Sequence, residues 1–160
     1  MIWSFNSATK YISGHSDTVA GVVVGGAALV ERIDQTVRPY LGASLSAQDA
    51  ARLIRGLRTL PIRIQRHHES GLTIATRLAA RNDVVRVCHP GLQPKKFSHL
   101  SGYGSLFSFE LSDAIDIPTF CDALELFHLG VSWGGYESLI VPAEASLNQA
   151  GENNAAVDFG

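Results

Sequence analysis

Apolar residues occur first as a continuous run. Residues 19–24 are rich in valine and of strand length, which predicts a strand covered on both faces. Two glycines end this run, and residues 27–37 predict a helix that stops before Pro39. A strand that leaves a polar segment and passes into a helix is typical of an α/β fold.

A long helix is predicted next, because apolar residues recur at steps of three, four or eight. These residues are Leu53, Leu57, Leu60, Ile64, Leu72, Ala75 and Leu78. Ser46 is the expected N-cap, with Asp49 near the exposed amides. Pro61 should kink or split the helix, since it removes a backbone donor. Five arginines are expected mostly on a solvated face: Arg52, Arg55, Arg58, Arg63 and Arg66.

The second half of the chain predicts a small α/β layer. Residues 85–87 and 106–111 have the composition of short strands. Residues 117–129 predict a helix with Pro118 in its first turn, and residues 139–141 predict a third strand. The polar tail from residue 143 is expected to be loop.

Length and composition limit the possible functions. The chain has 160 residues, one or at most two domains, and its 46% apolar and 18% charged residues are usual for a globular protein. A net charge of -2 without a long basic run disfavours nucleic acid as a partner. The longest apolar stretch is too short to span a membrane, and the N-terminus lacks a secretory pattern, so we expect a cytosolic protein.

The cysteines and histidines predict no metal site. Cys88 and Cys121 lie far apart in the sequence and are expected to be buried free thiols. His67 and His68 are adjacent, so on a helix they point about 100° apart, and we expect structural roles for them. His15 could hydrogen-bond to the backbone or orient Asp17.

The segment from Ser7 to Asp17 carries the most informative chemistry. Its hydroxyl groups and a glycine-containing turn could hold a phosphate, while the Lys10 amine could form a Schiff base with a carbonyl. Together these groups suit pyridoxal phosphate, an aldehyde that carries a phosphate. By spacing alone, the same segment also fits an ordinary loop with a solvated lysine.

This segment resembles the lysine segment of the Cys/Met-metabolism family of pyridoxal-phosphate enzymes, which includes cystathionine β-lyases, γ-lyases and γ-synthases. The resemblance continues in order over nearly the whole chain. It includes residues 55–60 (RGLRTL), 67–70 (HHES), 89–92 (HPGL), 104–109 (GSLFSF) and 132–139 (SWGGYESL).

The resemblance implies roles for five residues. Lys10 would form the Schiff base with pyridoxal phosphate, and Ser7 and Thr9 would help to hold the phosphate. Ser132 would lie by the substrate carboxylate. Trp133 would line the substrate pocket or fill the core.

The resemblance also implies a reaction. Residues 132–139 look most like those of bacterial cystathionine β-lyases, which release homocysteine, pyruvate and ammonia from L-cystathionine. The γ-lyases and γ-synthases usually carry glutamate where this chain has Val131, although Val131 also departs from the aromatic residue common in β-lyases. Activity of the γ type stays open as an alternative.

The fold implied by the resemblance is α/β, of the fold-type-I pyridoxal-phosphate class. Residues 1–66 would end the large cofactor-binding domain, and residues 67–160 would form part of the small C-terminal domain. Relatives are homotetramers and about two and a half times longer, so we expect a truncated, poorly soluble and inactive chain. The alternative is a non-catalytic fragment or a module that joins subunits.

Overall fold

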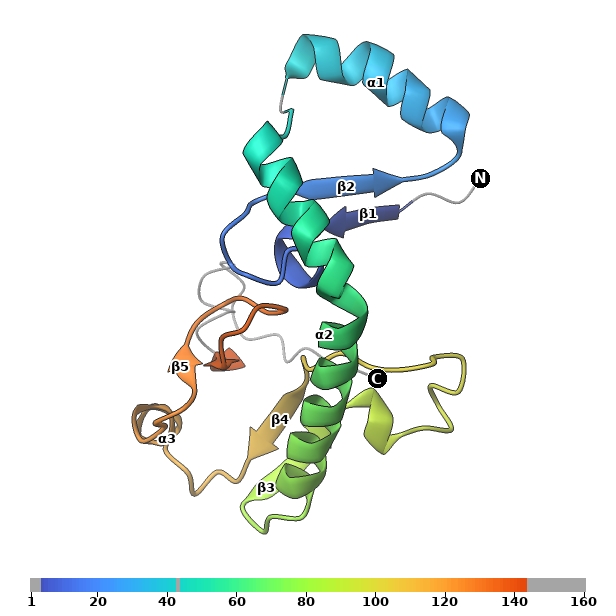
Figure 1. Ribbon diagram of the computed structural model, residues 1–160. Coiled ribbons are helices and arrows are strands. Elements are labelled where there is room, and N and C mark those ends of the chain that lie inside the picture. Colours follow the sequence, from blue (N-terminus) through green and yellow to red (C-terminus); the bar gives the residue numbers. More distant parts are fainter. Residues whose placement is uncertain (1–3, 43, 144–160) are drawn as a thin grey trace.

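A single helix of 33 residues, α2 (Ala47–Ala79), forms the spine of the computed structural model, which describes residues 4–42 and 44–143 (Figure 1). Ser46 caps α2 as predicted, since its Oγ accepts a hydrogen bond from the backbone N–H of Asp49 at 3.0 Å. Pro61 lies inside α2 without splitting it. A proline removes one helical hydrogen bond, and α2 is held on both sides of Pro61, by Gly56 against the Ile12 carbonyl and by His68 bound to the Tyr103 N–H.

Beside the N-terminal half of α2 lie strands β1 (Ser4–Ser7) and β2 (Gly21–Val24) and the short π-helix η1 (Ala8–Ile12). The strands pair antiparallel, with Ser4 opposite Val24 and Ser7 opposite Gly21. The prediction that this valine-rich strand is covered on both faces is wrong for the described residues, because Val24 is 56% exposed. A run of apolar residues indicates that a strand can be buried, but it does not show whether other elements cover its two faces.

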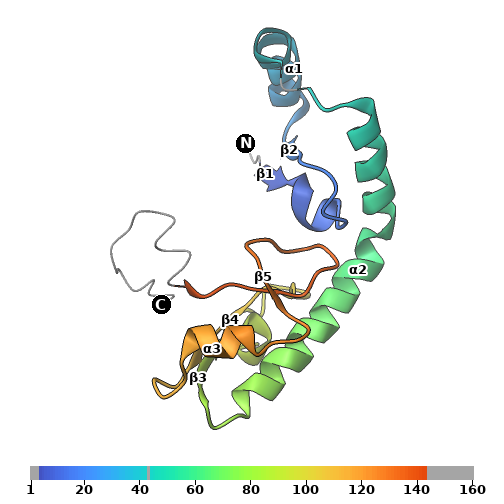
Figure 2. The same cartoon turned by 90° about the vertical axis from the view of Figure 1, so that its left-hand side faces the viewer.

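Helix α1 (Ala27–Leu41) extends beyond the end predicted for it. Pro39 lies within the last turn, where it removes one helical hydrogen bond and crowds the carbonyl four residues back, and the helix ends two residues later. The helix ends at Gly42, whose φ of 68° suits glycine and whose N–H donates to the Arg38 carbonyl at 3.1 Å. In both views α1 stands apart from α2 (Figures 1 and 2).

The C-terminal half of α2 carries the second group of elements. Strands β3 (Val84–Cys88) and β4 (Ser108–Leu111) pair antiparallel, close to their predicted positions. Between them, the 3-10 helix η2 (Pro90–Leu92) is capped by His89, whose Nδ1 accepts from the Gly91 N–H at 2.9 Å.

Helix α3 (Ile117–Asp122) starts where it was predicted, with Pro118 in its first turn, but it ends seven residues before the predicted end. Asp116 caps it, and Cys121 is its buried residue. The end of the predicted helix instead forms β5 (His128–Leu129), which pairs parallel with β6 (Leu139–Ile140). At residues 128–129, backbone pairing with β6 therefore outweighs the helix that the spacing of apolar residues predicted.

The described residues bury few apolar side chains. The buried ones are Ala8, Ala75 and Cys121. Cys88 is half-buried, and both cysteines are free thiols, as predicted. No helix of the described ranges is both long and apolar enough to cross a membrane. The molecule is therefore held together mainly along α2, with much apolar surface exposed.

Candidate functional site

The lysine segment runs from a strand directly into a short helix. Lys10 lies in η1 with a backbone conformation outside the helical range, φ -83° and ψ -122°. The helix is held by the Ser13 N–H, which donates to the Ala8 carbonyl, and by the Gly14 N–H, which donates to the Lys10 carbonyl, both at 2.8 Å. Ala8 and Ser13 are buried, so the segment has a fixed base.

The Lys10 amine meets two residues from the other end of the chain. Its Nζ donates a hydrogen bond to the Ser132 Oγ at 3.1 Å, although 122 residues separate the two. The same Nζ lies 4.3 Å from the centre of the Trp133 ring. A cation over an indole face is attracted by the ring quadrupole. The structure therefore brings together three of the five residues singled out from the sequence.

Gly134 makes this approach possible. Its φ is 79°, and a Cβ there would lie 2.7 Å from the Tyr11 nitrogen and 3.0 Å from the Lys10 carbonyl carbon. A side chain would thus overlap the lysine segment. Beyond the turn, the Ser16 hydroxyl donates to Glu137 and holds the pKa of that carboxyl below its usual value. The glycine turn thus supports the site through its backbone.

A pocket of about 280 Å³ opens beside the amine. It is lined by Phe5, Asn6, Ser7, Lys10, Tyr11, Ile12 and Trp133. Ser7 thus shares the pocket with Lys10, and Trp133 lines it while 42% exposed. Trp133 accordingly lies at the wall of this pocket, and its contact with a substrate stays a prediction.

Thr9 is engaged within the loop. Its Oγ1 accepts from the Ala20 N–H at 2.9 Å and donates to the Ala20 carbonyl at 3.3 Å. Its hydroxyl proton is therefore used by the backbone, and one acceptor lone pair is left. Contact of Thr9 with a phosphate, which needs that proton, stays a prediction.

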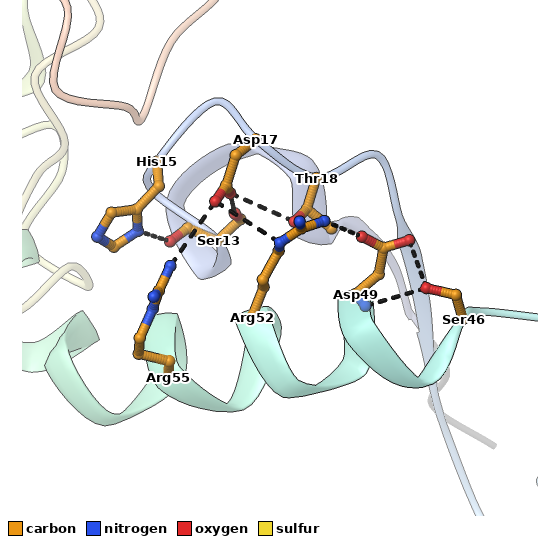
Figure 3. Close-up of polar contacts among 8 residues, drawn as sticks. All are labelled: Ser13, His15, Asp17, Thr18, Ser46, Asp49, Arg52 and Arg55. Atoms are coloured by element: carbon orange, nitrogen blue, oxygen red, sulfur yellow. Dashed lines mark hydrogen bonds and ion pairs between the residues drawn. The ribbon is translucent and has the colours of Figure 1, made fainter.

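The end of the lysine loop is tied to α2 by charge (Figure 3). Asp17 lies 4.0 Å from the Arg52 Nε and 3.7 Å from an Arg55 terminal nitrogen. Arg52 also pairs with Asp49, in the first turn of α2. His15 bonds through Nδ1 to the Ser13 carbonyl at 2.6 Å, so of its two expected partners it takes the backbone.

Arg63 is the exception among the five arginines of this helix, which were predicted to lie mostly on a solvated face and of which the other four are exposed. Its guanidinium is half-buried and donates to the Tyr11 carbonyl at 2.8 Å and to the Ile12 carbonyl at 3.3 Å. Helical spacing places a residue on a face but cannot show which loop lies against it. The available signal was Gly56, two turns earlier, because a glycine inside a helix often marks a close approach.

The paired histidines serve as structural contacts. His67 Nδ1 lies 2.9 Å from the Ser105 Oγ, and His68 Nδ1 accepts from the Tyr103 N–H at 3.1 Å. Burial, with the nearby Arg63 charge, lowers the pKa of His67. In the part of the chain that the structure describes, no three His, Cys, Asp or Glu residues are grouped as metal ligands would be.

Comparison with known proteins decides the family. Residues 3–157 match the family model described as Cys/Met metabolism PLP-dependent enzyme. The chain belongs to this family. The cystathionine beta-lyase of Salmonella typhimurium, a similar protein, is 37% identical over 165 residues, 98% of this chain and 41% of the relative.

Other members of the Cys/Met family are equally similar. The L-methionine gamma-lyase of Pseudomonas putida is 43% identical over 141 residues, 84% of this chain and 35% of the relative. A crystal structure of cystathionine gamma synthase from Xanthomonas oryzae pv. oryzae, in complex with aminoacrylate and cysteine, matches with a TM-score of 0.82 and 37% identity, over 94% of this chain and 40% of that one. The fold is therefore the α/β fold-type-I class predicted, and this chain spans about two fifths of such relatives.

The residues present suit the family's cofactor, pyridoxal phosphate. The pocket offers a primary amine on Lys10 and a hydroxyl on Ser7 along the same wall. An amine is the group that captures an aldehyde, and a hydroxyl is a donor to phosphate. The donor set thus fits both reactive ends of the cofactor.

Proposed function

We propose that this chain carries the lysine-bearing part of a carbon–sulfur lyase that uses pyridoxal phosphate to break L-cystathionine into homocysteine, pyruvate and ammonia. The observation that carries the proposal is the position of the Lys10 amine, between the Ser132 hydroxyl and the Trp133 ring at the pocket. Catalytic lysines need such a place, where a proton can be held and released.

When bound, pyridoxal phosphate supplies an aldehyde that condenses with amines and a ring that withdraws electrons from the substrate α-carbon. In this proposal the Lys10 Nζ takes the α-proton as general base. The Ser132 oxygen accepts a hydrogen bond from the charged amine, and the Trp133 face attracts it. Both contacts hold the amine at the pocket.

Binding roles follow from the same pocket. Ser7, and Thr9 after release of the Ala20 carbonyl, would donate to the phosphate. Trp133, which lines the pocket, and Ser132, which contacts the Lys10 amine, would contact the amino-acid substrate. A small sulfur amino acid suits a pocket of about 280 Å³ that has both an apolar ring and polar groups.

The choice of β- over γ-chemistry depends on Val131. This side chain is 60% exposed next to Ser132, and the γ-acting enzymes resembled by this chain usually carry glutamate there. Overall sequence identity does not distinguish the two reactions, because a β-lyase and a γ-lyase match this chain at similar levels. The products do: β-elimination yields pyruvate, whereas γ-elimination yields 2-oxobutyrate.

A second candidate function is a non-catalytic module that joins subunits. It is favoured by the large apolar side chains exposed on β1, β2 and α1, which include Phe5, Val24 and Tyr40. Assembly into a homotetramer belongs to either proposal. A cytosolic location and a division at residue 66 are also part of our proposal.

The test is release of pyruvate from L-cystathionine by the full gene product in the presence of pyridoxal phosphate. Lys10→Ala should lower kcat by about 100-fold to 10,000-fold, the range for loss of a positioned general base. Lys95→Ala, at an exposed position, is the matched control and should keep full activity. Pyruvate release that survives Lys10→Ala would overturn the catalytic proposal.

A further inference from the structure

Arg63 binds the backbone that follows Lys10. Its Nη1 donates to the Tyr11 carbonyl. Its Nη2 donates to the Ile12 carbonyl and also to the Gly56 carbonyl, the latter at 2.8 Å. Its Nε donates to the Thr59 Oγ1 at 3.1 Å. Four of the five guanidinium N–H groups are thus directed at fixed acceptors.

Two glycines give this side chain its place. A Cβ on Gly14, whose φ is 69°, would overlap the Arg63 guanidinium. A Cβ on Gly56 would overlap the Ile12 and Ser13 carbonyls, so only glycine lets the end of η1 lie so close to α2. The packing of η1 on α2 is therefore built around the guanidinium.

The charge of Arg63 is directed at carbonyl oxygens. Within residues 4–42 and 44–143, it forms no ion pair with a carboxylate. Burial lowers the pKa of the guanidinium, yet arginine stays charged at neutral pH. A cation at the C-terminal end of a short helix stabilises carbonyls that have no helical partner.

The bonded carbonyls directly follow the lysine. The Tyr11 and Ile12 carbonyls lie in the peptide planes that follow the Lys10–Tyr11 peptide, and the Lys10 backbone itself has non-helical φ and ψ. From that backbone the side chain extends to the Ser132 hydroxyl. Rotation of these planes would therefore move the amine, and a displacement of about 1 Å can reduce a reaction rate about 100-fold.

We infer that Arg63 is a positioning residue for the Lys10 amine, acting through the Tyr11 and Ile12 carbonyls. The inference rests on the proposed role of Lys10 as the cofactor-binding lysine. It assigns a function to an arginine that touches neither the pocket nor the amine. Its effect should thus appear in the reactivity of Lys10 and in kcat, while KM changes little.

The test measures how strongly pyridoxal phosphate labels each lysine. The full gene product is incubated with the cofactor, reduced with borohydride and mapped by peptide mass spectrometry. Lys95 and Lys96 are exposed and serve as internal references. Arg63→Met should lower labelling of Lys10 relative to these references by about tenfold, with kcat reduced by a similar factor.

Two further variants make the result specific. Arg66→Met removes a neighbouring arginine of α2 whose side chain is 79% exposed and should change nothing. Thr59→Val removes the acceptor for Arg63 Nε together with the bond that the Thr59 hydroxyl donates to the Gly56 carbonyl. It should give a smaller loss in a folded protein, so it serves if Arg63→Met does not fold. Arg63→Lys, which keeps the charge but not the fork of donors, should restore labelling in part.

The outcomes separate the two claims. Absence of label on Lys10 in the unaltered protein would overturn the proposed function itself. If Lys10 is labelled in the unaltered protein and equally strongly in folded Arg63→Met and Thr59→Val, the positioning role of Arg63 alone is overturned. A rise in KM with unchanged kcat and labelling would also contradict it.

Discussion

At the scale of the residue, the site depends on a few side chains that the chain brings together from both ends. Lys10, Ser132 and Trp133 could be found from the sequence, because they lie in motifs that resemble a known family. The contact between them could not, since 122 residues separate the amine from its hydroxyl partner. The role of Arg63 was missed for a related reason: its acceptors are backbone carbonyls, which have no sequence signature.

Gly134 provides a test at this scale. Gly134→Ala places a methyl group 2.7 Å from the Tyr11 nitrogen and requires a φ that L residues rarely adopt. We expect a loss of roughly 1–3 kcal/mol in the free energy of unfolding, measured by urea denaturation. Gly102→Ala is the matched control, because nothing lies within 4 Å of a Cβ there. Equal stability of the two variants would contradict the close approach.

At the scale of the element, α2 is the part that the sequence predicted best. A run of apolar residues at helical steps, a serine cap and a first-turn aspartate agree with one another, and the helix starts where they indicate. The ends of α1 and α3 were predicted less well. Pro39 lies inside α1 and does not end it, and the pairing of β5 with β6 depends on a strand ten residues away.

The contacts along α2 should weaken in acid. Burial lowers the pKa of His67 and of His89 below the ordinary value near 6.5, so the folded protein binds fewer protons than the unfolded chain. Stability should therefore fall as the pH drops from about 6.5 towards the folded pKa values. The measurement is the urea midpoint at a series of pH values between 7.5 and 5.

A variant locates this pH dependence. His67→Gln keeps a polar side chain next to Ser105 but cannot gain a proton, so its urea midpoint should change less between pH 7.5 and 5. His99→Gln, at an exposed position, should follow the unaltered protein. If His67→Gln lost as much stability on acidification as the unaltered protein, His67 would not be a source of the effect.

At the scale of the whole molecule, apolar surface is the main feature. The described chain buries three apolar side chains, while Val19, Tyr40 and Leu126 are each exposed by more than three quarters. Soluble monomers rarely leave large apolar patches open. The pattern of apolar residues alone could not foresee this, because it identifies residues able to form a core but not whether the chain supplies both sides of that core. The expectation of poor solubility came instead from the resemblance to a family of longer chains.

We expect the isolated chain to self-associate. Sedimentation velocity over a series of protein concentrations should show a rising average mass, and a dye that binds apolar surface should fluoresce strongly with it. Tyr40→Glu on α1 should reduce both signals, whereas Gln35→Glu on the same helix is the control for added charge. A monomer at all concentrations, with no dye binding, would contradict the expectation.

The pairing of Lys10 with Ser132 also has a consequence for synthesis. Ribosomes add about 5–20 residues per second, so the serine follows the lysine into the growing chain after roughly 6–24 s. During that interval the nascent lysine has neither its hydroxyl partner nor its aromatic partner, and it meets cellular aldehydes as an ordinary amine. Under the proposed function, capture of pyridoxal phosphate by this amine would therefore come after synthesis of Ser132 and Trp133.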